Sequence, residues 1–517
     1  MTGSPNGARM LLEAARDCGF SVCFANPGTT ELSLVRALAD VPAIRPVLSL
    51  FEGVCTGAAD GYARVTGQAA LTLLHLGPGL ANGVANLHNA RRARSPIVNL
   101  IGDHARWHLQ YDAPLTSDIS ALAHVVGPVI RMKDTSRIER DIAQASAAAA
   151  EGAVVTVVIP TDVMDAAGPA QAETPRSVTR PRGVVSALHI DKCATALSEG
   201  GPVVLLLGGE GLRPEGQRNA ARIAAATGAR LLMETYPAIV SLGGDLPRLE
   251  RLAYFPDDVM RQLDGAKVIL AGARGPVSYF GYEGFPSLLV PEGRLLGLAD
   301  PGENVLGALA ALAARFGDTP AAAPAITSAP SEQPQSEALT PVAIVAALIE
   351  QLPKDAIVSL EGSTLGGPWL QQAYRAGPHR VMTNTGGAIG QGLPCAVGAA
   401  IGCPEARVIA LQSDGSAQYT LQALWTMARE KLDVTIILAA NHRYGILQTE
   451  LKRSGADLGD TVLDRLTDLG DPRIDWVGLA QSYGVTAVRA GTAADFSAAL
   501  AQGLSVKGPF LIEASLP

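Results

Sequence analysis

Polar residues follow two strand-like runs near the end of the chain, and their types suit a metal ion and a phosphate. Ser413-Asp414-Gly415-Ser416 comes directly after the apolar run 407–412, and Asn441 ends the next such run, 27 positions after Asp414. In a parallel sheet both emerge at the carboxyl edge, where open α/β sheets bind their ligands. Asp414, Asn441 and a backbone carbonyl near Arg443 would give Mg²⁺ three oxygen ligands, with phosphate oxygens completing the shell.

The residues after Asp414 could contact that phosphate. Gly415 would let the backbone approach closely, and Ser416 and the amides at the following helix start would donate hydrogen bonds. The alternative is that Asp414 and Ser416 only cap the helix, as Asp and Ser often do. A lone Asp-Gly-Ser favours capping, but Asn441-x-x-Tyr444-Gly445 at this distance favours the metal site.

Together these segments resemble the signature of the thiamine-diphosphate enzyme superfamily, which is Gly-Asp-Gly, then about 25 to 30 residues, then Asn-Asn. The chain departs from it at Ser413 and Ala440, neither of which is a metal ligand in the family. The resemblance implies that Asp414, Asn441 and Arg443 hold Mg²⁺. It also implies cofactor contacts from Gly415, Ser416, Tyr444 and Gly445.

Two more stretches resemble cofactor-binding segments of the family. In Glu361-Gly362-Ser363-Thr364, the hydroxyls of Ser363 and Thr364 would bind the diphosphate, although turn formation is an equal alternative. Residues 386–394 resemble the segment that holds thiamine diphosphate in a V shape. Ile389 would then lie between the two rings, and the Gly387 carbonyl would receive the amino group. A glycine-rich turn before an apolar helix is the other interpretation.

Glu52 resembles the family's activating glutamate, whose carboxylate engages the cofactor's aminopyrimidine ring so that the thiazolium carbon loses its proton. It follows the strand-like run 45–50. A carboxylate is also favoured in the first turn of any helix. Three flanking motifs in family order favour the catalytic interpretation: residues 26–28 (Asn-Pro-Gly), 60–63 (Asp-Gly-Tyr-Ala) and 77–79 (Gly-Pro-Gly).

His75 ends the run 70–75, and its place resembles that of a proton-transferring histidine in benzoylformate decarboxylase. An imidazole titrates near neutrality, which suits that role, although a lone histidine on an apolar strand is more often a core residue. Thr29 matches the decarboxylase's substrate-binding serine. That enzyme's second pocket histidine would fall near Tyr279-Phe280, where this chain has none. The resemblance assigns these residues to the substrate pocket: Asn26, Gly28, Phe280, Ile446 and Leu447.

These matches predict a 2-oxo-acid decarboxylase or carboligase of the benzoylformate decarboxylase type. The alternatives are an acetolactate synthase-type acyl transfer, a 2-hydroxyacyl lyase and, more remotely, a non-catalytic nucleotide-binding paralogue with a site at Gly208–Gly211. Asp103 and Leu115 stand where synthases carry pocket glutamines, and His104 would line the pocket or hold a surface loop. Residues 259–273 show no clear FAD-binding segment, so we expect no FAD.

The elements that must position these residues follow a βαβ pattern, in which short apolar runs alternate with Ala-rich helical stretches. We expect strands at 21–25, 45–50, 70–75, 97–101, 203–207, 230–233, 267–271, 294–297, 356–360, 407–412 and 434–440. We expect helices from near Thr30, Gly53 and Leu80, and across 417–431.

The length of 517 residues suggests about three domains. We expect three doubly wound parallel-sheet α/β domains: pyrimidine-binding (1–168), middle (184–317) and diphosphate-binding (342–517). Pro-rich and Gly-rich stretches at 168–183 and 318–341 are the predicted linkers.

Net charge, the length of the apolar runs and the cysteine spacing argue against several classes of partner and site. A net charge of −8 argues against nucleic acid, no apolar run reaches the roughly 20 residues of a membrane span, and no signal peptide is evident. The six cysteines lack Cys-x-x-Cys spacing, so neither a disulfide framework nor a zinc site is indicated. We expect a cytoplasmic enzyme acting on a 2-oxo acid, with an aldehyde as a possible acceptor. The resemblance implies a homodimer or homotetramer with active sites shared between subunits.

Overall fold

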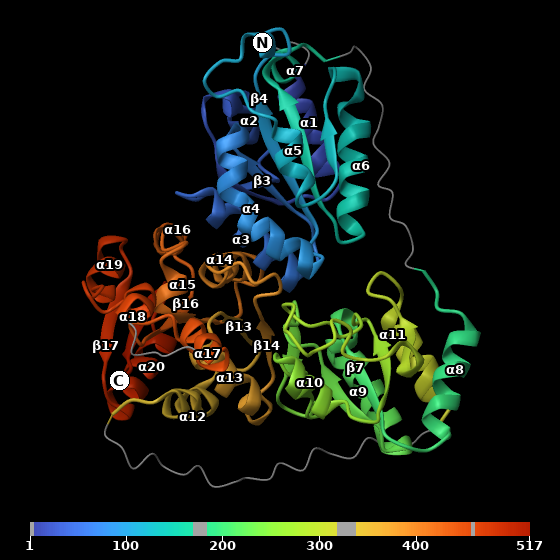
Figure 1. Cartoon of the computed structure of the whole chain (residues 1–517). Helices are drawn as coiled ribbons and strands as arrows, with labels where there is room; N and C mark the ends of the chain where they lie inside the picture. The colour runs from blue at the N-terminus through green and yellow to red at the C-terminus, as the bar shows by residue number, and fades with distance from the viewer. Residues whose placement is uncertain (1–4, 169–182, 318–337, 456–460) are drawn as a thin grey trace.

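The computed structural model describes residues 5–168, 183–317, 338–455 and 461–517, and it contains three sheets covered by helices (Figure 1). The first sheet is wholly parallel, in the order β2-β1-β3-β4-β6-β5. Its strands are β1 (Val22–Asn26), β2 (Arg45–Leu48), β3 (Ala70–Leu74), β4 (Ile97–Asp103), β5 (Val129–Arg131) and β6 (Val154–Pro160). One face packs against α1 (Gly7–Asp17), α2 (Leu32–Asp40) and α6 (Ile138–Ala150), and the other against α3 (Glu52–Thr66), α4 (Leu76–Ala93) and α5 (Ile119–His124).

The second sheet is also parallel, in the order β10-β8-β7-β11-β12. Its strands are β7 (Val203–Leu207), β8 (Arg230–Met233), β10 (Glu250–Arg251), β11 (Lys267–Ala271) and β12 (Leu295–Ala299). Helices α8 (Ala187–Ser198), α9 (Pro214–Thr227) and α11 (Val305–Ala314) cover one face, and α10 (Pro256–Gln262) lies on the other.

The third sheet has seven strands in the order β17-β18-β16-β15-β13-β14-β9. They are β9 (Val240–Leu242), β13 (Ala356–Leu360), β14 (His379–Met382), β15 (Val408–Ser413), β16 (Val434–Ala440), β17 (Thr486–Ala490) and β18 (Phe510–Ser515). Helices α12 (Pro341–Gln351), α13 (Ser363–Gln372) and α20 (Ala493–Ser505) cover one face, and α14 (Gly392–Gly402), α16 (Ala423–Arg429) and α19 (Trp476–Ser482) the other. Beyond these lie the short α15 (Asp414–Ala417), α17 (Gly445–Arg453) and α18 (Thr461–Thr467).

These sheets confirm the predicted α/β class. Strands β7, β8, β11, β13 and β16 have the predicted residues. In β7, β13 and β16 every residue is buried, as expected of a strand covered on both faces. The pattern did not predict β5, β6, β9, β10, β14, β17 or β18. β9 comes from the middle of the chain and pairs antiparallel with β14, at the edge of the third sheet.

Two helix predictions were wrong. Helix α4 begins at Leu76 rather than near Leu80, with Gly77-Pro78-Gly79 forming its first turn, a position that tolerates proline. The helix expected across 417–431 is two short helices, α15 and α16. The residues between them pack on the glycine-rich segment instead, since Thr420 donates a hydrogen bond to the Gly390 carbonyl.

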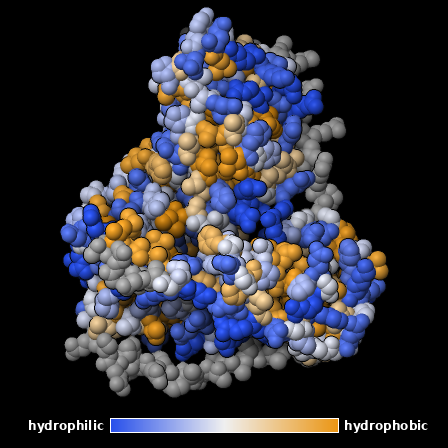
Figure 2. All heavy atoms as spheres, in the orientation of Figure 1, coloured by the Kyte–Doolittle hydropathy of each residue, from blue (hydrophilic) through white to orange (hydrophobic). Residues whose placement is uncertain are grey.

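The three parts are joined by continuous cores. In Figure 1 the N-terminal part lies above the other two, and α14 lies directly beneath α3 and α4. Side chains of α3 and α14 belong to one buried cluster, and a second cluster runs from the middle sheet into the C-terminal one. Figure 2 shows hydrophilic side chains gathered where the N-terminal part meets the lower two.

The predicted domain boundaries stay predictions, since most of both proposed linkers lies outside the described residues. None of the helices among the described residues combines the length and the hydrophobicity that a membrane span requires.

Candidate active site

Glu52 is the first residue of α3, and its carboxylate turns toward α4. It is 9% exposed, and Asn82 Nδ2 donates to its Oε2 at 3.0 Å. A Cβ placed on Gly79 would lie 3.0 Å from the other oxygen, Oε1, which receives no hydrogen bond from the described residues. The site therefore holds a buried carboxylate with one oxygen available to a ligand.

His75 lies beside Glu52, across Gly79, and is fixed by a second buried carboxylate. Its Nδ1 is 2.8 Å from Glu31 Oε2 and 3.2 Å from the Thr30 hydroxyl. Glu31 is fully buried, whereas the His75 side chain is 23% exposed. A carboxylate can only accept, so Nδ1 carries a hydrogen and Nε2 remains free to accept or donate a proton.

The pair is enclosed by backbone that leaves no room for larger residues. Gly28 lies against the imidazole, because a Cβ there would come 2.1 Å from His75 Nδ1. A Cβ on Gly102 would likewise come 2.1 Å from Glu31 Oε1. Glu31 also accepts from the Gly28 amide at 2.9 Å and from the Thr30 hydroxyl at 2.7 Å. Both orientation and position of the imidazole are thus set by its neighbours.

Glu31 was missed by sequence reasoning. Its spacing from Gly28 is that of a helix-capping residue, and its carboxylate accepts from the Gly28 amide, which is one half of a capping box. Only the fold shows that the same carboxylate also holds His75. Thr29, the predicted substrate contact, is exposed at the start of the same turn, and Asn26 ends β1 nearby.

Asp414 lies at the carboxyl end of β15 and is 2% exposed. Its oxygens accept from the amides of Gly415 at 2.8 Å and His442 at 2.7 Å. Burial raises the pKa of this carboxyl, and the two amides act in the opposite direction. A cation beside it would favour the charged form.

Asn441 ends up near Asp414 because β15 and β16 are parallel neighbours. Its amide nitrogen donates to Thr364 Oγ1 at 3.2 Å, and its Oδ1 accepts from the Arg443 amide at 3.3 Å. The described residues contain no group of three or more His, Cys, Asp or Glu side chains arranged for a metal. A metal ion at this edge would therefore need the Asn441 amide and a backbone carbonyl as well as Asp414, a ligand set that suits Mg²⁺.

Ser413, which stands where the family signature has its first glycine, packs against a glycine of a neighbouring segment. Ser413 lies against Gly362, where a Cβ would come 1.9 Å from the serine hydroxyl and where φ is +98°. The segment that carries Ser363 and Thr364 at the start of α13 is therefore seated against the Asp414 loop.

The other predicted cofactor contacts, Gly415, Ser416, Tyr444 and Gly445, lie at the same edge of the C-terminal sheet, and the Ser416 hydroxyl already makes hydrogen bonds within the protein. The Ser416 hydroxyl donates to the Ser413 carbonyl at 3.2 Å and accepts from Gln412 at 2.7 Å. Gly415 packs under Tyr444, since a Cβ there would lie 2.6 Å from that ring. Gly445 begins α17.

The glycine-rich segment with Ile389 is held by Glu361, a second carboxylate that the sequence reasoning did not single out. Glu361 is 3% exposed and accepts from the amides of Gly390 and Gly392, each at 2.7 Å, and from Gln412 at 2.9 Å. Gly387 and Gly390 have φ of +79° and +93°. Ile389 is 37% exposed, so it remains accessible on a rigid turn.

Helix α4 ties this segment to the helix of Glu52. Asn89 exchanges two hydrogen bonds with the Ala388 backbone, at 2.7 and 3.1 Å. Asn86 donates to the Gly53 carbonyl at 2.8 Å and to the Gly390 carbonyl at 3.4 Å. A single chain therefore places the Ile389 turn next to the start of α3.

Phe280, Ile446 and Leu447, the predicted apolar lining, are 61%, 43% and 46% exposed. The two segments that carry them are connected through aromatic rings, since Arg453 of α17 lies over the Phe255 ring, Phe255 contacts Tyr254, and Tyr254 contacts Tyr279 with ring centroids 4.8 Å apart. The structure brings these residues to one region of the surface without packing them into a core.

Two further predicted positions have structural partners. Asp103 pairs with Arg131 at 2.6 Å and accepts from the His104 amide. At Gly208–Gly211 the glycines serve backbone packing, because a Cβ on Gly208 would lie 2.6 Å from the Gly272 carbonyl oxygen. That contact accounts for the glycine without a nucleotide.

Comparison with known proteins matches both ends of the chain to one family. Residues 5–123 match the model for the N-terminal TPP binding domain of thiamine pyrophosphate enzymes, and residues 365–514 match the model for their C-terminal TPP binding domain.

Among curated relatives, the chain is 45% identical to a Mycobacterium tuberculosis protein named "Putative acetolactate synthase large subunit IlvX", over 99% of both chains. It is 28% identical to benzoylformate decarboxylase of Pseudomonas aeruginosa, over 97% of both. Among solved structures, the thiamine diphosphate-dependent 4-hydroxybenzoylformate decarboxylase of Rhodococcus jostii matches with a TM-score of 0.84 and 27% identity, over 99% of both chains.

Proposed function

The chain belongs to the thiamine pyrophosphate enzymes, in their acetolactate synthase and benzoylformate decarboxylase group, and we propose that it is a 2-oxo-acid decarboxylase or carboligase. It would cleave or form the C–C bond next to the carbonyl of a 2-oxo acid, using thiamine diphosphate and Mg²⁺ and no FAD.

Bound thiamine diphosphate supplies the nucleophilic carbon that adds to the 2-oxo group and the electron sink that lets CO₂ leave. Glu52 would engage the aminopyrimidine with the carboxylate oxygen that the protein leaves free. Its burial beside Gly79 and Asn82 excludes water from this hydrogen bond and keeps the carboxylate in place.

The opposite end of the cofactor would be held at the C-terminal sheet. Asp414, Asn441 and the Arg443 carbonyl would bind Mg²⁺, and Ser363, Thr364 and the amide of Gly415 would face the diphosphate. Glu361 fixes the turn on which Ile389 would support the bent cofactor. These assignments rest on the position of each residue at one sheet edge.

His75 would move the proton to or from the substrate, and Glu31 would act as its positioning residue. Because Nδ1 is bound to Glu31, Nε2 of the protonated imidazole would deliver a proton to the carbon from which CO₂ has left, or to the carbonyl oxygen of an aldehyde when the new C–C bond forms to it. Glu31 would also stabilise the imidazolium that donates this proton, as an orienting carboxylate does in hydrolase triads.

The Glu52 and His75 pair on either side of Gly79 is the observation that carries this proposal. An acyl transfer to a second 2-oxo acid is the alternative, favoured by the name of the 45% identical relative. In the decarboxylase or carboligase reaction the acceptor is a proton or an aldehyde, whereas in acyl transfer it is a second 2-oxo acid. His75 could donate the proton that the decarboxylase reaction needs.

A product screen separates the two. The holoenzyme is incubated with pyruvate, benzoylformate and branched 2-oxo acids, each with and without an aldehyde, and CO₂ and carbon products are quantified. We expect CO₂ and an aldehyde from a single 2-oxo acid, and a hydroxy ketone when an aldehyde is added. Products that form only from two 2-oxo acids would favour acyl transfer.

Glu52→Gln tests the mechanism in the same assay. Loss of the ionisable carboxylate should lower kcat by about 100-fold or more, while thiamine diphosphate still binds. Glu13→Gln, on the exposed face of α1, is the matched control and should leave kcat unchanged. Full activity of Glu52→Gln would refute the assigned role.

A further inference from the structure

Helix α17 carries a carboxylate on the same side as the predicted apolar lining. The helix begins at Gly445, directly after the candidate metal-binding segment, and Glu450 follows Ile446 by four positions. Residues four apart lie on one side of a helix, so Glu450 continues the line of Ile446 about 6 Å further along the helix axis. A group that extends along the helix from Ile446 would therefore reach the Glu450 carboxylate.

Aromatic side chains of the middle part lie against this helix. The five rings, here called the aromatic shelf, are Tyr254, Phe255, Tyr279, Phe280 and Tyr282. In the contacts among them the ring centroids lie 4.8, 4.9 and 6.2 Å apart. Arg453, near the end of α17, lies over the Phe255 ring and joins the helix to the shelf. Tyr279 and Phe280 remain exposed, so the shelf offers ring surface to an aromatic ligand.

Two polar atoms lie unpaired where α17 meets the shelf. Glu450 Oε1 and the Tyr282 hydroxyl are both buried without a hydrogen-bond partner among the described residues. Burial raises the pKa of the Tyr282 hydroxyl, and the negative charge of Glu450 raises it further, so the two groups lie close together. A buried polar atom of this kind costs free energy until a ligand or a water satisfies it.

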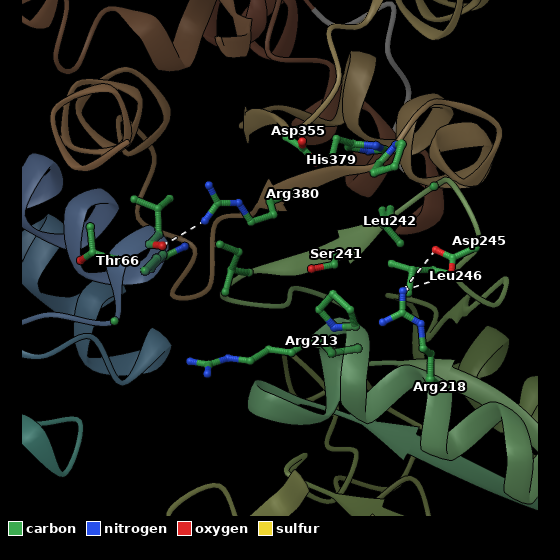
Figure 3. A pocket seen from close by; sticks show the side chains of 18 residues that line it. Thr66, Arg213, Arg218, Ser241, Leu242, Asp245, Leu246, Asp355, His379 and Arg380 are labelled. Atoms are coloured by element: carbon green, nitrogen blue, oxygen red, sulfur yellow. Dashed lines mark hydrogen bonds and ion pairs between the residues drawn. The ribbon is translucent and has the colours of Figure 1, made fainter. Parts of the chain in front are cut away.

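The charge of Glu450 is also unpaired. It forms no salt bridge within the described part of the chain, and Arg453 pairs instead with Asp257 at 2.8 Å. The cavity of about 590 Å³ between the end of α3, β9 and the start of β14 is different, since Figure 3 shows Arg218 turned to Asp245, which it contacts at 3.1 Å. The charged groups of that cavity largely offset one another, whereas the charge of Glu450 has no counterpart.

We propose that Glu450 and Tyr282 recognise a hydroxyl group at the far end of the substrate's acyl substituent, so that the enzyme prefers aromatic 2-oxo acids with a ring hydroxyl. A hydroxyl both donates and accepts, so it would donate to Glu450 Oε1 and accept from the Tyr282 hydroxyl. An ammonium group can only donate and would leave the Tyr282 hydroxyl unpaired. The aromatic ring of the substrate would pack on the shelf. The inference rests on the proposed function, because it names the substrate class of the same site.

The preference is measured on the holoenzyme with two matched pairs of substrates. One pair is benzoylformate and 4-hydroxybenzoylformate, and the other is phenylpyruvate and 4-hydroxyphenylpyruvate, which places the ring one methylene further out. We expect kcat/KM of at least one hydroxylated acid to exceed that of its parent at least about tenfold. The reason is that an analogue without the hydroxyl leaves the buried polar atoms unpaired. Equal kcat/KM within both pairs would overturn the proposal.

Glu450→Leu should remove the preference by lowering kcat/KM for the hydroxylated acid and not for its parent. Tyr282→Phe, which deletes only the hydroxyl oxygen, should reduce the ratio in the same direction. Lys452→Leu is the matched control and should keep the wild-type ratio, because Lys452 is exposed on the same helix and residues two apart do not share a face. Circular dichroism establishes that each variant is folded. A wild-type ratio in both Glu450→Leu and Tyr282→Phe would show that these groups do not recognise the hydroxyl.

A binding measurement separates this inference from the proposed function. Calorimetry of 4-hydroxybenzoate and benzoate with the holoenzyme needs no turnover. We expect the hydroxylated acid to bind the wild type at least about tenfold more tightly, and the two acids to bind Glu450→Leu equally. If no 2-oxo acid is turned over, the proposed function fails and the binding preference alone decides the inference. Equal affinity of the wild type for the two acids, or binding of neither, would then overturn it.

Discussion

At the scale of single residues, the site depends on two carboxylates that act in different ways. Glu52 keeps one oxygen free for a ligand. Both oxygens of Glu31 accept hydrogen bonds from the protein, and one of them accepts from His75. The first arrangement suits contact with a reacting molecule, and the second suits positioning.

Glu31→Gln should therefore lower kcat by at least about tenfold, since general acid-base catalysis contributes about 10² to 10⁴ and depends on orientation. The amide can donate to Nδ1 and so favours the wrong tautomer. Steady-state kinetics should show a smaller change in KM than in kcat, with thiamine diphosphate affinity retained.

A double-mutant cycle with His75→Ala provides the control. If Glu31 acts through the imidazole, adding Glu31→Gln to His75→Ala should cost little more, because the effects of residues that act as a unit are not additive. Additive losses would contradict the positioning role.

Glu234 makes stability depend on pH. Burial raises the pKa of this carboxyl from 4.5 to about 7, so the folded protein binds the proton more tightly than the unfolded chain. The stability that this carboxyl contributes is therefore fully present below pH 4.5 and is lost as pH rises through 7, by on the order of 3 kcal/mol.

Glu234→Gln removes this titration. Thermal unfolding between pH 5 and 8 should show Tm of the wild type falling by on the order of a few degrees more than that of the variant. Parallel Tm curves for the two proteins would contradict the assignment.

At the scale of elements, the contact between α3 and α14 positions Glu52 relative to the turn of Ile389. It depends on the absence of side chains: a Cβ on Gly61 would lie 2.2 Å from the Cys395 carbonyl oxygen, and one on Gly398 would lie 1.8 Å from that of Ala58. The helices can approach this closely only with glycine at both positions.

Gly61→Ala and Gly398→Ala should each lower Tm and weaken thiamine diphosphate binding, since overpacking costs about 1 to 3 kcal/mol. Gly367→Ala in α13 is the matched control, because its Cβ would meet no atom within 4 Å and alanine favours a helix. Calorimetry and thermal unfolding measure both effects. Equal behaviour of all three variants would show that the close approach is unimportant.

At the scale of the whole molecule, apolar runs predicted the three-part fold well. Strands buried on both faces, such as β7 and β16, are continuous apolar runs, so their own residues are enough to predict them. β9 has three residues and is held by β14, more than 130 positions away, so no local pattern could predict it. Likewise, Glu31 and Glu361 look like turn residues until the fold brings His75 and Gly390 to them.

Assembly is the remaining prediction at this scale. One chain already places the Glu52 helix beside the Ile389 turn. The homodimer or homotetramer that the family resemblance implies stays a prediction. A cytoplasmic location likewise remains a prediction from the sequence.

We propose that this chain holds thiamine diphosphate through a metal ion at Asp414 and Asn441. Isothermal titration of thiamine diphosphate into the metal-free protein, with and without Mg²⁺, tests it most directly, with Asp414→Ala as the comparison. We predict saturable binding that requires Mg²⁺ and is weakened at least tenfold in the variant. Absence of binding by the wild type with Mg²⁺ present would show that these residues do not hold thiamine diphosphate.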